Sequence, residues 1–380
     1  MRPLLLSLAT LLPLVAAEDD PVAELLARVK ALDGVVDTIA REHADPVDRD
    51  RLWASARAGL VGALDPDSAW LDRGQAAVRA GADRSRRDGY GFDWRPEDGL
   101  ITRVVPHSPA AGAGIAPGDR LRTIDGQPAA DAAHRLAAEQ VVLGWASPDG
   151  ERTAPVHRAL FADSGISAPV DLGDGVALVR IHRFLADPPE PSMDAPSTPA
   201  ALARMLDPAW RALVLDLRGC GGGHLGAAVA CGGALLPAGL PQVVIARHVS
   251  GNRAIDQVLA ADGSAAGSPA IVVLVDGGTG SAGELLAAAL RHHRKAVLAG
   301  GRTMGKDTVQ QVFLMPEGDA LLLTVARLRD PAGRDWARGL EPDVPLDLDE
   351  AARLRGLRDG PAADPALARA RDLALAARGR

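Results

Sequence analysis

The chain has 380 residues, which is enough for two or three domains. Its net charge is −7 and its basic residues are scattered along the sequence, so we expect no nucleic-acid partner. Aromatic residues make up only 3% of the chain, so packing must rely on Leu, Val and Ala.

Residues 1–17 have the pattern of a secretory signal peptide. Arg2 supplies a positive start, residues 4–14 are mostly apolar, and Ala16 and Ala17 fit a small-residue cleavage site. A membrane anchor is the alternative, but this run is too short, and no later segment reaches the ~18 uninterrupted apolar residues of a spanning helix. We therefore expect an exported protein, most simply a periplasmic one, with no membrane span after signal cleavage.

Residues 18–85 are expected to form an N-terminal helical region, because apolar residues recur there at helical spacing. The pattern changes over residues 86–162. Leu100–Val105 predicts a strand, a short helix follows Ser108, and a further strand ends at the tight turn of Asp125 and Gly126.

This second segment, residues 86–162, resembles a PDZ domain. Tyr90, Gly91 and Phe92 stand where such domains carry the loop that binds the terminal carboxylate of a chain. The resemblance implies that a peptide end is added as a strand to an exposed sheet edge, with free N–H groups holding its carboxylate. A β-domain without a ligand is the alternative.

Residues 163–349 contain the elements of a larger domain, and residues 350–380 are expected to form a C-terminal helical tail. Apolar runs predict strands, and Ala- and Leu-rich segments predict helices. The predicted strands are Val176–Phe184, Ala212–Asp216, Ile271–Val275, Ala296–Ala299 and Leu321–Leu328. The predicted helices are Ala200–Trp210, His224–Leu236 and one that contains Glu284–Leu290.

Two glycine loops follow predicted strands of this domain. Asp216–Gly223 leads into a helix start, where free backbone N–H groups can bind an anion such as the tetrahedral oxyanion of acyl transfer. Asp276–Gln311 places Ser281 at a strand–turn–helix junction and Lys306 after a second turn. Lys306 is one of only three lysines in an arginine-rich chain. A lysine can lose its proton when buried and then activate a serine hydroxyl, which arginine effectively cannot do; an ordinary surface lysine is the alternative.

Two motifs carry a resemblance to the carboxyl-terminal processing (tail-specific) proteases: Gly280-Ser281-Ala282-x-Glu284 and Gly305-Lys306-x-x-x-Gln310. The interval between Ser281 and Lys306 also fits that family. The resemblance implies that Ser281 is the nucleophile, Lys306 its base and Gln310 the residue that orients the lysine. It also implies oxyanion donors at Gly222 or Gly223 and at Ala282.

The same resemblance implies a fold and a function. The fold is α/β, a crotonase-like protease core with a PDZ domain and an N-terminal helical region before it. The function is a serine endopeptidase that cuts proteins near their C-termini, with protein or peptide substrates and an adaptor protein as partners. No metal, nucleotide or other cofactor is expected. Cys220 stands where the family usually has asparagine, which puts in doubt the side-chain hydrogen bond that steadies the first glycine loop.

Several alternatives compete with this interpretation. A phosphate-binding loop would need Ser or Thr after Lys306, where Asp307 stands. His224, beside the first glycine loop, offers a Ser–His pair, although it fits a helix start better. Two functions without catalysis are an impaired relative that binds peptides and a carrier of small apolar ligands. Cys220 and Cys231 are predicted to be free thiols, because a turn and part of a helix separate them.

Overall fold

The computed structural model describes residues 21–187, 196–249, 253–260, 269–294 and 296–377, so the predicted signal peptide lies outside the described residues. The chain divides after Trp70 into two compact units, which are described separately. The smaller unit contains α1 (Pro21–Glu42) and α2 (Arg49–Gly62), and the carboxylate of Asp48 caps α2 by accepting a hydrogen bond from Asp50 N at 2.9 Å. Among the described helices, none is long and apolar enough to cross a membrane.

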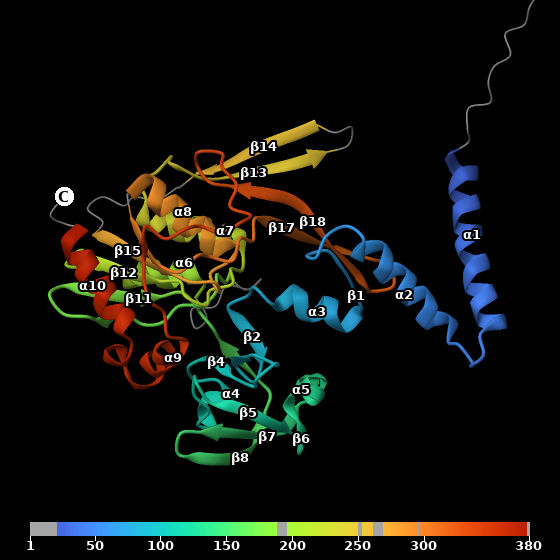
Figure 1. Cartoon of the computed structure of the whole chain (residues 1–380), viewed down its shortest axis with the longest axis horizontal. Coiled ribbons are helices and arrows are strands. Elements are labelled where there is room, and N and C mark those ends of the chain that lie inside the picture. Colours follow the sequence, from blue (N-terminus) through green and yellow to red (C-terminus); the bar gives the residue numbers. More distant parts are fainter. Residues whose placement is uncertain (1–20, 188–195, 250–252, 261–268, 295, 378–380) are drawn as a thin grey trace, which may run out of the picture. The chain divides into compact units, whose positions relative to one another are not determined.

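The larger unit begins with short elements and small sheets (Figure 1). β3 pairs with β4, β2 pairs with β9, and four strands form a sheet in the order β6-β5-β7-β8. Ile101, Leu143 and Trp145 are almost inaccessible and form the centre of its core. The bounds are α3 Arg73–Gly81, β2 Arg86–Gly89, β3 Phe92–Trp94, β4 Ile101–Val104, α4 Pro109–Gly112, β5 Arg120–Ile124, β6 Gln127–Pro128, α5 Ala129–Ala132, β7 Gln140–Ser147, β8 Gly150–His157 and β9 Ala159–Ala162.

A six-stranded sheet organises the rest of the unit, in the order β10-β11-β12-β15-β16-β19. All neighbours pair in parallel except β10, which is antiparallel to β11. The predicted strand over Ala212–Asp216 is confirmed as β12. The bounds are β10 Val170–Asp171, β11 Val176–Arg180, α6 Thr198–Met205, β12 Ala212–Asp216, α7 Leu225–Leu235, β15 Ala270–Val275, α8 Ala282–Arg294, β16 Val297–Gly300 and β19 Val344–Pro345.

Both faces of this sheet are covered, which explains why its strands are continuous apolar runs. Alternate residues point to opposite faces, so Leu213 and Leu215 pack with α6, α7 and α8, while Val214 lies in the cluster on the other face. Parallel strands require crossover connections, and α6 and α8 provide two of them. The predicted strand Val176–Phe184 was too long, because the chain leaves the sheet after Arg180 and Phe184 instead bridges Gly223.

A second, antiparallel sheet contains β13 (Pro241–Val249), β14 (Arg253–Ala260), β17 (Thr308–Leu314) and β18 (Ala320–Arg329). Only β18 matches a strand that the sequence predicted. The hairpin of β17 and β18 begins at Thr308, two residues after Lys306. The pairing of these strands therefore fixes the direction of the chain that follows the second glycine loop.

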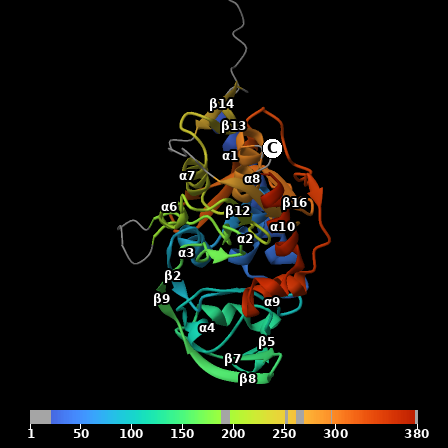
Figure 2. The same cartoon turned by 90° about the vertical axis from the view of Figure 1, so that its left-hand side faces the viewer.

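The C-terminal helices belong to the core of the unit rather than forming a separate tail. α9 (Glu350–Asp359) ends at Gly360, whose φ of 106° disfavours other residues, and α10 (Pro365–Ala377) follows. Leu367, Ala370 and Ala374 of α10 are buried against the six-stranded sheet. Arg358 of α9 binds Asp119, just before β5, at 2.5 Å, and α9 lies beside the region of the small sheets in both cartoon views (Figures 1 and 2).

Candidate active site

Three loops meet at the carboxyl edge of the six-stranded sheet, because they follow the neighbouring parallel strands β12, β15 and β16. Backbone hydrogen bonds join them. Gly280 N donates to Cys220 O at 2.9 Å, and Met304 N donates to Thr279 O at 2.9 Å. Asp276 Oδ1 accepts from Gly219 N at 2.8 Å. The loops therefore form one site, although the first and third are more than 80 residues apart in the sequence.

Ser281 stands at the start of α8 with a φ of 51°, in the left-handed region that few non-glycine residues adopt. Such backbone strain concentrates at functional sites, where it directs a side chain outward. The residue is half-buried. Its hydroxyl has no hydrogen-bond partner among the described residues, so it is available to a ligand.

Glu284 holds the serine loop and the lysine loop together. Its Oε2 accepts from Ser281 N and from Lys306 N, both at 2.9 Å. Its Oε1 accepts from Thr303 Oγ1 at 2.5 Å and from Gly305 N at 2.7 Å. Burial raises the pKa of this carboxyl group, while the four donors favour its ionised form. One fully buried carboxylate thus fixes the backbone of Ser281 relative to that of Lys306.

Glu284 belongs to the serine motif, but no role was predicted for it. A signal was present, because Ser281-x-x-Glu284 is the capping-box pattern, in which the glutamate accepts from the N–H at the helix start. Here the same carboxylate also reaches a second loop. That second set of bonds depends on the tertiary arrangement, which the pattern does not contain.

Lys306 and Gln310 lie on the segment that leaves this site. Lys306 is half-buried, and its carbonyl oxygen accepts from Trp336 Nε1 at 3.4 Å. Gln310 lies on β17 next to an irregularity in the pairing with β18. Its side-chain nitrogen donates to Thr324 Oγ1 at 3.2 Å. The structure thus brings the backbones of Ser281 and Lys306 together. Gln310 lies on β17, the strand that begins two residues after Lys306.

Gly222 and Gly223 lie beside the serine, with φ of 108° and 136°. A Cβ on Gly222 would come within 2.9 Å of Ser281 Cβ and 3.1 Å of Ala282 N, so only glycine fits at this position. The Gly222 N–H lies near the Cys220 thiol and lowers its pKa, against the larger effect of burial. The N–H groups of Gly223 and Ala282 have no acceptor among the described residues. Both are therefore available to donate hydrogen bonds to a ligand.

The two cysteines are free and buried, as predicted. Burial raises the pKa of the Cys220 thiol to about 12, so it carries almost no thiolate at neutral pH. The burial of this thiol and its raised pKa both disfavour a cysteine nucleophile in this loop.

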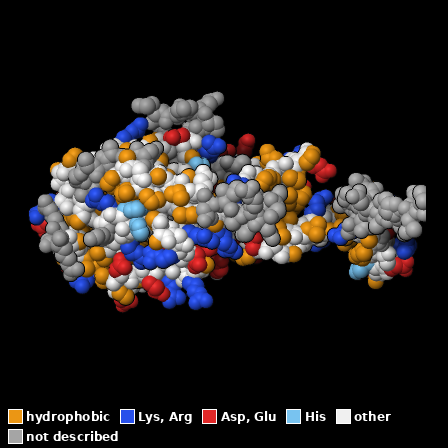
Figure 3. All heavy atoms as spheres, turned by 90° about the horizontal axis from the view of Figure 1, so that it is seen from above, with side chains coloured by type: hydrophobic (Ala, Val, Ile, Leu, Met, Phe, Trp, Pro, Cys, Tyr) orange, Lys and Arg blue, Asp and Glu red, His pale blue; other side chains and the backbone are white. Residues whose placement is uncertain are grey.

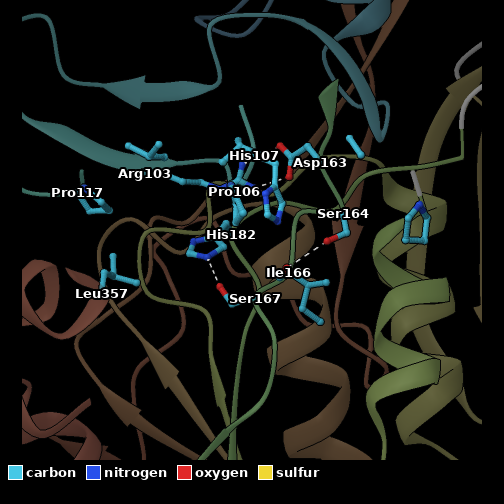
Figure 4. A pocket seen from close by; sticks show the side chains of 14 residues that line it. Arg103, Pro106, His107, Pro117, Asp163, Ser164, Ile166, Ser167, His182 and Leu357 are labelled. Carbon is cyan, nitrogen blue, oxygen red and sulfur yellow. Dashed lines mark hydrogen bonds and ion pairs between the residues drawn. The ribbon is translucent and has the colours of Figure 1, made fainter. Parts of the chain in front are cut away.

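Histidines near the site have structural partners. His224 is the N-cap of α7, and its Nδ1 accepts from Ala227 N at 3.2 Å, which confirms the predicted helix-start role. His182 lines a separate pocket of about 390 Å³ and points at Ser167, with 2.8 Å between its Nε2 and the Ser167 oxygen (Figure 4). Burial, with Arg103 and Arg180 nearby, holds the pKa of His182 well below its usual value.

In the predicted carboxylate-binding loop, the Tyr90 side chain has a structural role, whereas the backbone N–H groups are available to a ligand. Tyr90 is buried and donates its hydroxyl to Ala138 O at 2.8 Å, so its side chain is structural. Gly91 has a φ of 84° and packs on Ser108. The N–H groups of Tyr90 and Gly91 have no acceptor within the described part of the chain. Phe92 begins β3, which among the described strands pairs only with β4, so one edge of β3 is open to strand addition.

Charged side chains of both signs are visible on one face of the larger unit (Figure 3). On the face of the larger unit in Figure 3, Lys and Arg side chains lie among Asp and Glu side chains.

Comparisons with known proteins identify the family of the chain and two of its domains. Residues 175–346 match peptidase family S41, and residues 100–141 match the PDZ domain. The chloroplastic C-terminal processing peptidase of Tetradesmus obliquus is 30% identical over 335 residues, which cover 80% of this chain and 70% of that protein. The carboxy-terminal-processing protease of Bartonella bacilliformis is 26% identical over 349 residues, covering 85% and 76%.

A solved structure of a C-terminal processing protease is also similar to this chain. The photosystem II D1 C-terminal processing protease superposes with a TM-score of 0.54 at 26% identity, covering 88% of this chain and 97% of that one. The chain therefore belongs to the carboxy-terminal processing proteases, which are serine peptidases of family S41.

Proposed function

We propose that the protein is an exported endopeptidase that uses Ser281 and Lys306 as a catalytic dyad and cuts proteins near their C-termini. The observation that carries this proposal is the Glu284 carboxylate, whose Oε2 lies 2.9 Å from both Ser281 N and Lys306 N. A serine with a strained backbone and a lysine held beside it are the parts that such a dyad needs.

In the proposed mechanism, the neutral Lys306 amine takes the Ser281 proton while Ser281 Oγ attacks the scissile carbonyl carbon. The oxyanion accepts hydrogen bonds from the N–H groups of Ala282 and Gly223, which have no acceptor among the described residues. The Lys306 ammonium then protonates the leaving amine. Water, activated by the same lysine, hydrolyses the acyl-enzyme. Gln310 orients the Lys306 side chain from the first turn of chain after it, where β17 begins.

We further propose domain boundaries at residues 17, 85, 162 and 349. They separate a signal peptide, a helical region, a PDZ domain, a crotonase-like protease core and the C-terminal helices. The parallel sheet with α6, α7 and α8 on one face supports the core assignment. Export rests on the signal-peptide pattern of residues 1–17 alone, and an adaptor protein is a further proposed partner.

Two experiments on substrates test this function. An unfolded protein is incubated with the enzyme, and product masses are expected to place the cuts near its C-terminus. Amidating that C-terminus, or deleting its last few residues, should slow cleavage, because the N–H groups of Tyr90 and Gly91 favour a terminal carboxylate. Identical rates for both altered substrates and the parent would remove the PDZ domain from substrate selection.

An impaired peptide-binding relative is the second candidate function, and Cys220 is the observation that favours it. We predict that Cys220→Asn preserves or raises activity, because an asparagine oxygen accepts from Gly222 N–H more strongly than a thiol does. The measurement is kcat/KM on one peptide, with Cys231→Ser as the buried-thiol control. A loss of ~10²-fold or more, the size expected for a damaged oxyanion site, would show that the thiol itself is needed.

Glu284→Gln tests how the two loops are held together. An amide NH₂ would face two of the four donors that now bind the carboxylate, so the loops should separate slightly. A displacement of ~1 Å at a catalytic group can cost ~10²-fold, so we expect kcat to fall by about 10- to 100-fold. Glu341→Gln is the exposed control, since its side chain is 63% accessible. Equal kcat values in both variants would mean that Glu284 does not position the site.

A further inference from the structure

A cleft of about 590 Å³ lies beside the first glycine loop, and we name it the arginine cleft. Gly219 and Gly221–Gly223 form one wall, and Gly222 also contacts Ser281. Five arginines and three carboxylate residues, Asp93, Asp276 and Glu350, line it. The arginines are Arg95, Arg103, Arg183, Arg218 and Arg353.

Four of these arginines are occupied by carboxylates of the protein. Arg218 binds Asp216 at 2.8 Å and Asp364 at 2.7 Å. Arg103 binds Asp163 and Arg183 binds Asp83. Arg95 binds Asp98 and Glu350. These arginines stabilise the walls of the cleft and are not available for a ligand.

Arg353, on α9, differs from the other four. It is only 8% exposed, yet its guanidinium has no hydrogen-bond or ion-pair partner among the described residues. The guanidinium lies 3.4 Å from the position that a Cβ on Gly219 would occupy. The nearby Asp276 is already bound by the N–H groups of Gly219 and Gly278. Its nitrogens are not among the fully buried atoms that lack a hydrogen bond, so the guanidinium is open to the cleft, where a ligand anion can bind it.

We propose that Arg353 binds a carboxylate of the peptide substrate two or three residues from the scissile bond. Gly219, beside Arg353, and Gly222, beside Ser281, belong to the same short loop, and that loop forms one wall of the cleft. A carboxylate at that position in the substrate can therefore reach the guanidinium while the cut bond lies at Ser281. The planar fork of arginine matches a carboxylate with two parallel hydrogen bonds.

This inference rests on the proposed function and defines a substrate class. The carboxylate is either the free C-terminus of a chain cut two or three residues from its end, or an acidic side chain at that position. Recognition of a chain end by Arg353 would be separate from recognition by the PDZ loop.

Kinetics on matched peptides test the proposal. One peptide has a free C-terminus three residues beyond the cut, a second is its amide, a third is the amide with glutamate at the third position, and a fourth is longer by ten residues. Arg353→Gln should raise KM by at least ~10-fold for the free acid, the loss of one charge-assisted pair, with kcat nearly unchanged. The plain amide and the long peptide should respond little. A matching response of the glutamate peptide identifies an acidic side chain as a second source of the carboxylate.

Arg355→Gln is the matched control, because Arg355 lies on the same helix, is 56% exposed and pairs with Asp349. It should change KM for none of the peptides. Equal KM changes for the free acid and the amide in Arg353→Gln, or no change in either, would overturn the proposal. Cleavage of the long peptide reports the proposed peptidase function independently, so the two failures are distinguishable.

Thermal unfolding tests the unfilled site without any cleavage. Arg353→Met keeps the length of the side chain and removes the unpaired charge, so its unfolding temperature should equal or exceed that of the wild type. Arg218→Met should unfold at a lower temperature, because it removes the ion-pair partner of Asp364 and leaves Asp216 with Arg180 alone. A large decrease for Arg353→Met would mean that Arg353 stabilises the fold instead of waiting for an anion.

Discussion

Replacing Ser281 by alanine should abolish proteolysis and leave the fold intact. Loss of a catalytic nucleophile typically lowers kcat by ~10⁶-fold, so residual cleavage should be below detection in an ordinary assay. The folded state should lose little, because the hydroxyl has no hydrogen-bond partner among the described residues and alanine fits the same space. Product formation from an unfolded protein, together with the unfolding temperature, measures both effects.

Ser167→Ala is the matched control for this experiment. Ser167 is the serine whose hydroxyl pairs with His182, so it is the nearest alternative Ser–His arrangement. It should retain the wild-type rate. Cleavage at equal rates by Ser281→Ala and the wild type would show that Ser281 is not the nucleophile.

Lys306→Arg should also inactivate the enzyme, although it keeps the positive charge. A guanidinium cannot give up its proton at any working pH, so it cannot act as a general base. General-base assistance is typically worth ~10²–10⁴-fold, and the loss in kcat should be at least of that order. If Lys306 were only a surface charge, arginine would preserve most of the activity, since most basic positions of this chain already carry it.

Lys30→Arg provides the control, because Lys30 is exposed on α1. The rates of wild type, Lys306→Arg and Lys30→Arg are measured with one peptide. An active Lys306→Arg variant would overturn the dyad and bring His224 back into consideration.

The sequence predicted the parts of the fold that depend on local pattern. β12 and β15 were recognisable because a parallel strand buried on both faces is a continuous apolar run. The loops after them were recognisable because glycine dominates turns with positive φ, as at Gly222 and Gly223. The hairpin of β13 and β14 was missed, since its pairing depends on contacts that no local pattern contains.

The candidate site was predictable to a similar extent. Ser281, Lys306 and the glycine loop were found from motifs, whereas the bonds from Glu284 to Gly305 and Lys306 join residues that only folding brings together. Arg353 could not be distinguished from the many other arginines, because its burial and lack of a partner depend on how α9 packs. For the same reason the sequence predicts a helical tail over residues 350–380, whereas Leu367 of α10 is buried in the core.

The central claim is that Ser281 is a nucleophile activated by Lys306, and covalent labelling tests it most directly. The protein is incubated with a peptide phosphonate ester that reacts with activated hydroxyls, and peptide mass spectrometry locates the adduct. We expect one adduct, on Ser281 of the wild type, and its loss in Lys306→Arg. An adduct on Ser167 or Cys220, or undiminished labelling of Ser281 in Lys306→Arg, would contradict it.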